Sequence, residues 1–141
     1  MCLEKTWPRG GPDWAAVGVL VSGGRVLMIR RVEREGDPWS GQVAFPGGRW
    51  KPGEDLLGTA VREVEEEVGV RPEGLIGVLP PLSPRNAPWL KVVPFLFSKW
   101  SGEVVPNPAE VKEVRWISKE ELTEGEWVGR CLLYTSPSPR D

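Results

Sequence analysis

The stretch GGRWKPGEDLLGTAVREVEEEVGV, residues 47–70, decides the fold. Its first part is crowded with glycine and proline, which favours a loop, and its second part carries apolar residues at helical spacing. The spacing predicts an amphipathic helix that follows Glu54 and ends at Gly69, a glycine suited to the position after a helix C-terminus. The apolar stripe of this helix consists of Leu57, Val61, Val64 and Val68.

The same helix carries four glutamates among residues 63–67. At about 100° per residue, Glu63, Glu66 and Glu67 fall within an arc of roughly 100° opposite the apolar stripe, and Glu65 lies off that arc. Like charges at these spacings repel, and the helix dipole disfavours anions near its C-terminal end. A divalent cation would reverse the sign of these interactions. An acidic run by itself is more often a solvated helix face, so the residues around it must decide.

Those residues match a longer pattern, GX5EX7REUXEEXGU, in which U is aliphatic. Every fixed position is present, namely Gly48, Glu54, Arg62, Glu63, Val64, Glu66, Glu67, Gly69 and Val70. This pattern is the Nudix box, and the chain resembles the Nudix hydrolases. The resemblance covers roughly residues 12 to 127 and implies an α+β fold, an α/β/α sandwich around a mixed β-sheet, with the box as a loop-helix-loop.

The resemblance also implies a metal site. In that family the box helix holds Mg²⁺ or Mn²⁺ through the glutamates that match Glu63, Glu66 and Glu67. A backbone carbonyl of the paired glycines, Gly47 or Gly48, can complete the metal shell. Ligands that are all oxygen suit such hard cations, in agreement with a sequence that contains no histidine.

The implied reaction is metal-dependent hydrolysis of a pyrophosphate bond in a nucleoside diphosphate linked to another group. Arg62 is expected to orient its neighbour through a salt bridge, and Glu54 to assist at the helix start. A glutamate must accept the proton of the attacking water, and the candidates are Glu63 in the box and Glu110 in the segment NPAEV. Glu113 is a weaker candidate, and for Glu110 and Glu113 ordinary surface charge beside a strand is the alternative.

Two segments indicate a branch of the family. GQVAFPGG, residues 41–48, and PNPAEVKEV, residues 106–114, are similar to sequences of the coenzyme A pyrophosphatases. One residue departs from that branch, because Asp37 stands where an arginine is usual. The expected substrate is therefore coenzyme A or an acyl-CoA, cleaved to 3′,5′-ADP and 4′-phosphopantetheine.

The residues expected to bind this substrate lie before and within the box. Arg30 and Arg31, with Arg34 nearby, carry the positive charge that a 3′-phosphoadenosine group needs. Gly48 brings the backbone close to the phosphates. Trp39 has an aromatic face that can stack on adenine, although packing against the sheet is the more common use of such a residue.

Several other functions remain alternatives. ADP-ribose and (d)NTP are open substrates within the hydrolases. A non-catalytic Nudix-like nucleotide-binding module is disfavoured, because the metal glutamates are all intact. An isomerase of allylic diphosphates on the same fold is disfavoured too, because it would need histidine ligands and the chain has no histidine.

Composition excludes further classes. The chain has 141 residues and a formal net charge of −2, which fits one domain and lacks the basic field of a nucleic-acid-binding protein. No apolar run approaches the roughly 20 residues that span a bilayer, so no membrane partner is expected. The two cysteines exclude a disulfide framework, and the cytoplasm is the expected compartment. A small-molecule nucleotide is the expected partner, and a homodimer remains open.

The remaining elements are expected to be mostly strands. We predict strands at residues 15–21, 25–31, 42–45, 75–79, 90–97 and 110–118, and a second helix that starts after Ser118 with Glu121 in a capping box. Pro94 indicates that its strand is an edge strand or bulged. We expect one domain over residues 1–130, truncated at its C-terminus. Residues 131–141, CLLYTSPSPRD, resemble a translated sequencing adapter and are expected to be a non-native tail.

Overall fold

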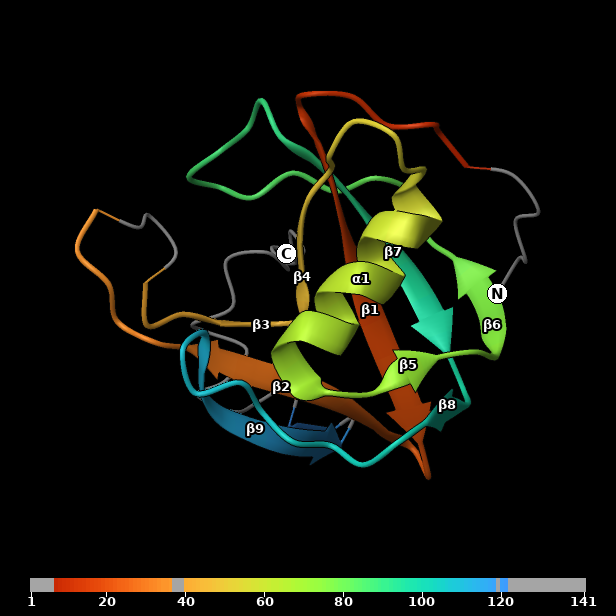
Figure 1. Ribbon diagram of the computed structural model, residues 1–141, viewed down its shortest axis with the longest axis vertical. Coiled ribbons are helices and arrows are strands. Elements are labelled where there is room, and N and C mark those ends of the chain that lie inside the picture. The colour runs from red at the N-terminus through yellow and green to blue at the C-terminus, as the bar shows by residue number, and fades with distance from the viewer. Residues whose placement is uncertain (1–6, 37–39, 119, 122–141) are drawn as a thin grey trace.

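The computed structural model describes residues 7–36, 40–118, 120 and 121, and its strands form a mixed sheet crossed by one helix (Figure 1). The sheet order is β3-β2-β1-β7-β6, with β4 paired to β1 and β9 paired to β2, and β5 and β8 form a separate pair. The strands are β1 (Trp14–Ser22), β2 (Arg25–Arg31), β3 (Val43–Ala44), β4 (Gly47–Arg49), β5 (Arg71–Pro72), β6 (Leu75–Val78), β7 (Lys91–Phe97), β8 (Trp100–Ser101) and β9 (Val111–Ser118), and the helix is α1 (Leu56–Val68).

The mixed character of the sheet comes from its central pair. β1 and β7 run parallel from Trp14 opposite Lys91 to Leu20 opposite Phe97, and the other pairs are antiparallel. The other edge of β1 is divided between β4 near its start and β2 near its end. This arrangement confirms the expected α+β fold with a mixed sheet.

Strand β4 lies where the sequence predicted only a loop. It pairs Gly47 with Val17 and Gly48 with Ala16. A Cβ on Gly47 would collide with the carbonyl oxygen of Ala16, so a glycine is required for this close approach. The prediction of a loop is wrong for residues 47–49. Glycine and proline usually interrupt strands, whereas here glycine permits the close pairing of β4 with β1.

Helix α1 begins and ends as expected. Asp55 is its N-cap and accepts a hydrogen bond from the Gly58 N–H at 2.8 Å, and Gly69 follows it with a left-handed φ of 79°. The helix packs on β1, β4 and β7 (Figure 1). Its buried residues are Leu56, Thr59, Ala60, Val64, Glu67 and Val68.

The buried face of α1 differs from the predicted stripe. Leu57 and Val61 are only partly buried, whereas Leu56 and Ala60 are fully buried. The face that contacts the sheet is therefore rotated by about one residue toward the glutamates. As a result Glu67 is only 3% exposed, and its predicted position on the face opposite the core is wrong.

Pro94 does not mark an edge strand, because β7 lies between β1 and β6. Its carbonyl oxygen accepts a hydrogen bond from the Leu79 N–H at 3.0 Å, just beyond the end of β6 at Val78. Because Pro94 has no N–H, one hydrogen bond to the neighbouring strand is lost, and it is lost at the end of β6. The pairing of β6 with β7 is irregular, but between Leu75 and Gly77 and not at Pro94.

The predicted second helix starts at the edge of the described residues. The Ser118 N–H donates to Glu121 Oε1 at 3.0 Å, and the Glu121 N–H donates to Ser118 Oγ at 3.2 Å, which is the reciprocal pattern of a capping box. The rest of that helix and the proposed adapter tail at 131–141 lie outside the described residues. Of the helices that are described, none is both long and apolar enough to cross a membrane.

Candidate active site

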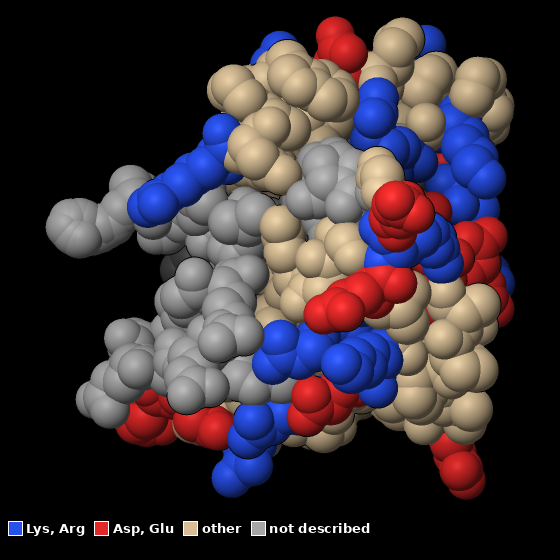
Figure 2. All heavy atoms as spheres, turned by 90° about the vertical axis from the view of Figure 1, so that its left-hand side faces the viewer, with Lys and Arg blue, Asp and Glu red and all other residues tan. Residues whose placement is uncertain are grey.

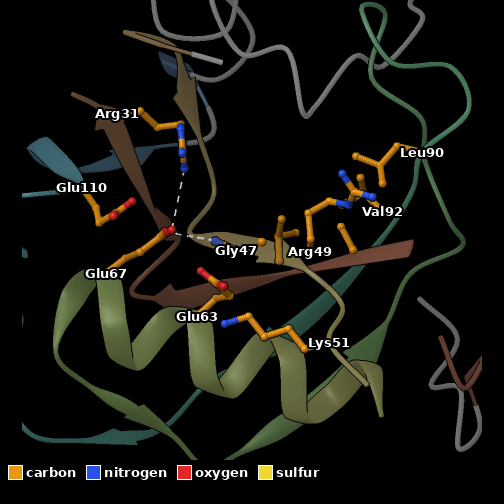
Figure 3. Close-up of a pocket in the computed structure, with 12 residues that line it drawn as sticks. Arg31, Gly47, Arg49, Lys51, Glu63, Glu67, Leu90, Val92 and Glu110 are labelled. Atoms are coloured by element: carbon orange, nitrogen blue, oxygen red, sulfur yellow. Dashed lines mark hydrogen bonds and ion pairs between the residues drawn. The ribbon is translucent and has the colours of Figure 1, made fainter. Parts of the chain in front are cut away.

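The C-terminal turns of α1 face the glycine pair of β4. The Gly47 N–H donates a hydrogen bond to Glu67 Oε1 at 3.2 Å, and Arg31 Nη1 on β2 lies 3.7 Å from Glu67 Oε2 (Figure 3). Burial and the neighbouring Glu63 carboxylate raise the pKa of Glu67 to about 9. Glu67 is therefore a buried acid held between a backbone amide and a guanidinium.

Glu63 lies one turn earlier and faces the same space. A Cβ placed on Gly48 would be 2.5 Å from its carboxylate carbon, so the glycine leaves just enough room for this side chain. Burial raises the pKa of Glu63 as well, and a hydrogen bond and charge attraction from Arg62 partly oppose the rise. Two acids with raised pKa values thus sit side by side at one end of the sheet.

Arg62 joins the helix to the loop that precedes it. Its Nη1 lies 2.7 Å from Glu63 Oε2, and its Nη2 lies 2.8 Å from Glu54 Oε1. Glu54 also accepts hydrogen bonds from the Thr59 hydroxyl at 2.8 Å and the Lys51 N–H at 3.0 Å. The hydrogen bond from Arg62 is the largest cause that lowers the pKa of Glu54 to about 2. Arg62 thus contacts both Glu63 and Glu54, and Glu54 lies just before the start of α1.

Glu66 points away from this pair. Its side chain is 54% exposed and its carboxylate lies 3.5 Å from Arg62 Nη1. Within the described ranges, no three acidic or cysteine side chains converge closely enough to hold a metal ion. The structure thus brings together Glu63, Glu67 and the backbone of Gly47, and leaves Glu66 outside that group.

A cavity of about 280 Å³ opens above these acids (Figure 3). Its acidic side chains are Glu63, Glu67 and Glu110. Its basic side chains are Arg31, Arg49 and Lys51, and its apolar wall is made by Ala15, Val17, Leu90 and Val92. In Figure 3, Arg49, Leu90 and Val92 lie at the opposite end from Arg31, Glu67 and Glu110. One end of the cavity therefore suits charge and cations, and the other suits an apolar group.

Arg49, Lys51 and the apolar wall were not predicted from the sequence. Arg49 and Lys51 directly follow the glycine pair, and the β4 strand carries this segment along the cavity. A strand at residues 47–49 would have indicated both residues, because an extended chain that starts at the glycine pair runs past the acidic side chains of the cavity. Leu90 just before β7 and Val92 within it are distant in sequence from the box, and no local signal marks them.

Glu110 reaches the cavity from a loop that is tied to the end of α1. The Asn107 N–H donates to the Glu67 carbonyl oxygen at 2.9 Å, and the Val32 N–H donates to the Glu110 carbonyl oxygen at 3.0 Å. Arg34 Nη2 donates to the Ala109 carbonyl oxygen at 2.6 Å and lies 3.8 Å from Glu110 Oε2. These bonds hold the Glu110 carboxylate at the cavity.

Other predicted residues are placed elsewhere. Arg30 does not line the cavity; its Nε lies 3.4 Å from the carboxylate of Glu113, its partner across β2 and β9. Trp39 and Asp37 fall outside the described residues. On the face of the molecule in Figure 2, basic side chains are interspersed with acidic ones, consistent with the balanced composition.

Comparison with protein families gives one match that spans most of the chain. The model described as the NUDIX domain matches residues 12–133. Nudix hydrolase 15, mitochondrial, of Arabidopsis thaliana is 33% identical over 149 aligned positions, which cover 93% of this chain and 52% of that protein. The peroxisomal coenzyme A diphosphatase NUDT7 of Mus musculus is 34% identical over 141 positions, covering 86% of this chain and 58% of that protein. The chain spans a little over half the length of these curated relatives.

The fold is shared with solved structures. The crystal structure of a MutT Nudix hydrolase from Burkholderia pseudomallei superposes with a TM-score of 0.59 and 26% identity, over 77% of this chain and 84% of that one. The superposition agrees with the mixed sheet and single described helix found here.

Proposed function

The chain belongs to the Nudix hydrolase family, and from that premise we propose that it is a metal-dependent pyrophosphohydrolase that cleaves coenzyme A or an acyl-CoA. The products would be 3′,5′-ADP and 4′-phosphopantetheine. ADP-ribose and (d)NTPs are the substrates to test beside coenzyme A. A cytoplasmic location and a possible homodimer stay predictions from the sequence.

One observation carries the proposal: the buried Glu67 and the partly buried Glu63 line one cavity beside the Gly47–Gly48 pair. A buried pair of like charges is unfavourable unless a proton or a cation compensates it. Arg31 beside Glu67 and Arg62 beside Glu63 compensate part of this charge. A hard divalent cation fits the all-oxygen donor set and would compensate the rest.

The residues that would hold Mg²⁺ or Mn²⁺ follow from this placement. Glu63 and Glu67 would be the carboxylate ligands, and the Gly47 backbone lies against Glu67, where its carbonyl can complete the set. Glu66, whose side chain is 54% exposed and lies outside the cavity lining, would join them only if it turned toward the cavity. The bound cation would supply positive charge that screens the pyrophosphate and acidifies the attacking water.

The protein's own side chains would do the rest. Arg31 beside Glu67 would bind a phosphate oxygen, and the backbone of Gly48, which lines the cavity, would lie against the phosphates. Arg62 would keep the Glu63 carboxylate in place through its 2.7 Å contact. Glu110 at the cavity would accept the proton of the attacking water, with Glu63 as the alternative acceptor.

The coenzyme A substrate has separate support. The mouse relative is named a coenzyme A diphosphatase, and the segment NPAEV places Glu110 at the cavity. The cations that line the cavity are Arg31, Arg49 and Lys51, so Arg30, which contacts Glu113 and lies outside the lining, is not part of the proposed substrate site. Three cations match the high negative charge of a phosphorylated nucleoside diphosphate.

The test is incubation of the purified protein with coenzyme A and Mg²⁺, with mass-spectrometric detection of 3′,5′-ADP and 4′-phosphopantetheine. ADP-ribose and dNTPs run in parallel. Glu67→Gln should lose turnover by about 100-fold or more. Glu65→Gln is the matched control, because Glu65 lies on the same helix and its side chain is 46% exposed.

Each outcome bears on a different part of the proposal. Cleavage of coenzyme A that Glu67→Gln loses and Glu65→Gln keeps supports both substrate and site. Turnover of only ADP-ribose or a dNTP retains the hydrolase and rejects coenzyme A. A folded protein that cleaves none of them would instead be a nucleotide-binding module.

A further inference from the structure

Trp89 stands beside the apolar end of the cavity with much of its side chain exposed. It is 50% exposed, and the only other large hydrophobic residue so exposed among the described residues is Val105. The residue after Trp89, Leu90, lines the cavity with Val92. The exposed indole thus adjoins the cavity and offers an aromatic face to a ligand bound there.

Arg49 links Trp89 to the cavity. Its guanidinium carbon lies 5.0 Å from the centroid of the Trp89 ring, and its side chain lines the cavity. The Pro12 carbonyl oxygen accepts a hydrogen bond from Arg49 Nη2 at 2.6 Å, which fixes the guanidinium in this position. The guanidinium and the indole are both planar groups on which a flat ring can stack.

The loop that presents Trp89 is preorganised. The Ala87 N–H donates to the Pro84 carbonyl oxygen at 3.1 Å, and the Leu90 N–H donates to the Ala87 carbonyl oxygen at 3.0 Å. The Lys91 N–H then donates to the Asp13 carbonyl oxygen at 2.9 Å and ties the loop to the segment before β1. A ligand that covers Trp89 would therefore lose little free energy in ordering this loop.

The layout of the cavity selects the chemical class of the ligand. The acids and Arg31 lie at one end, and Arg49, Leu90 and Val92 lie at the other (Figure 3). A substrate whose phosphates reach Glu63 and Glu67 would place its next group against this second end. An amide-rich flexible chain would need hydrogen-bond partners that an apolar wall does not offer, whereas a flat ring can stack on an indole or a guanidinium.

We propose that Trp89, Arg49 and Leu90 form the subsite that binds the nucleobase of the substrate. Lys51, which also lines the cavity, supplies a cation for the phosphates between the base and the acids. The proposal rests on the proposed function, since it assigns a position to part of that substrate. It makes Trp89 a specificity-determining residue that acts on substrate binding and not on the bond that breaks.

The test compares AMP with ribose 5-phosphate by isothermal titration calorimetry, because the two ligands share a sugar phosphate and only AMP has a base. Wild-type protein should bind AMP about tenfold more tightly, the typical value of one aromatic stack. Trp89→Ala should bind both equally, and Trp89→Phe should keep most of the preference. Val105→Ala, which removes the other exposed hydrophobic side chain, should behave as wild type.

Thermal midpoints of the variants verify that each is folded before the titrations are compared. An AMP preference that survives in Trp89→Ala, or a wild type with no preference, overturns the subsite. Hydrolysis assays on the same variants separate this result from the proposed function. If Trp89→Ala loses the AMP preference but wild type hydrolyses nothing, the subsite is kept and the proposed enzyme activity is rejected. If wild type hydrolyses its substrate but Trp89→Ala keeps the AMP preference, the enzyme activity is kept and the subsite is rejected.

Discussion

Gly48 lies so close to Glu63 that a Cβ at position 48 would be 2.5 Å from the Glu63 carboxylate carbon. The neighbouring Gly47 is equally crowded, but against the backbone of Ala16 and Val17. Two adjacent glycines of one short strand thus serve different purposes. The first permits the pairing of β4 with β1, and the second leaves space for an acid of the candidate site.

These two glycines should respond differently to the same substitution. Gly47→Ala pushes backbone against backbone, and we expect it to lower the free energy of unfolding by about 2–3 kcal/mol. Gly48→Ala only displaces a flexible carboxylate, so it should cost less than about 1 kcal/mol while reducing turnover roughly 100-fold. Urea denaturation and steady-state kinetics measure the two effects. A Gly48→Ala variant with normal turnover would show that the position of Glu63 is not critical.

Metal ions should stabilise the protein more at high pH than at low pH. The pKa of Glu67 is raised from 4.5 to about 9 in the folded protein. The protonated form therefore adds stability below pH 4.5, and this contribution is lost as the pH rises toward 9. A cation must displace that proton, so the rise in thermal midpoint caused by Mg²⁺ should be larger at pH 8 than at pH 6.

Glu67→Gln provides the control for this prediction. The amide cannot ionise, so the variant should lose the pH-dependent part of the stability without metal and most of the response to Mg²⁺. Chelation with EDTA should return the wild type to its metal-free midpoint. An equal Mg²⁺ response in wild type and Glu67→Gln would place the cation elsewhere.

The sequence predicted where the main strands lie along the chain and where the helix begins and ends, because local signals encode these positions. Gly69 and the apolar run of β1 are read within a few residues. The rotation of α1 is different, since it depends on how the helix packs against β1, β4 and β7. Leu57 and Leu56 are both apolar, and only the sheet decides that Leu56 is the buried one.

The site was predictable in its acids and less so in its surroundings. The Nudix box predicted the same role for Glu63, Glu66 and Glu67, and in the structure Glu63 and Glu67 line the cavity whereas the Glu66 side chain is 54% exposed. The far wall of the cavity includes Leu90 and Val92, which are separated from the box by more than one strand. No spacing within the sequence connects Trp89 to Arg49, because their contact depends on the tertiary fold.

Glu54 should protect the fold against acid. Hydrogen bonding to Arg62 lowers its pKa from 4.5 to about 2, so its stabilising contribution is present above pH 4.5 and is lost as the pH falls toward 2. Glu54→Gln should lower the free energy of unfolding at pH 7 by about 1 kcal/mol, because solvent screens this partly exposed pair. The difference from wild type should shrink toward pH 2 in urea titrations. Glu65→Gln, whose exposed partner is Arg71, should change stability by less than about 0.5 kcal/mol.

Arg34 should affect catalysis through Glu110. It donates to the Ala109 carbonyl oxygen at 2.6 Å and lies 3.8 Å from Glu110 Oε2, so its removal would free the carboxylate that faces the cavity. If Glu110 accepts the proton, Arg34→Ala should lower kcat about tenfold with little change in KM, and Arg34→Lys should restore part of the loss.

The same variants decide which glutamate is the proton acceptor. Glu110→Gln should lower kcat about 100-fold or more, and adding Arg34→Ala to it should cause no further loss, because Arg34 acts only through that carboxylate. Arg71→Ala, a removal of positive charge at an exposed pair with Glu65, is the matched control and should leave kcat unchanged. If Glu110→Gln and Arg34→Ala both retain full kcat, Glu110 is excluded, and Glu63, held by Arg62 at the metal-binding end of the cavity, becomes the acceptor.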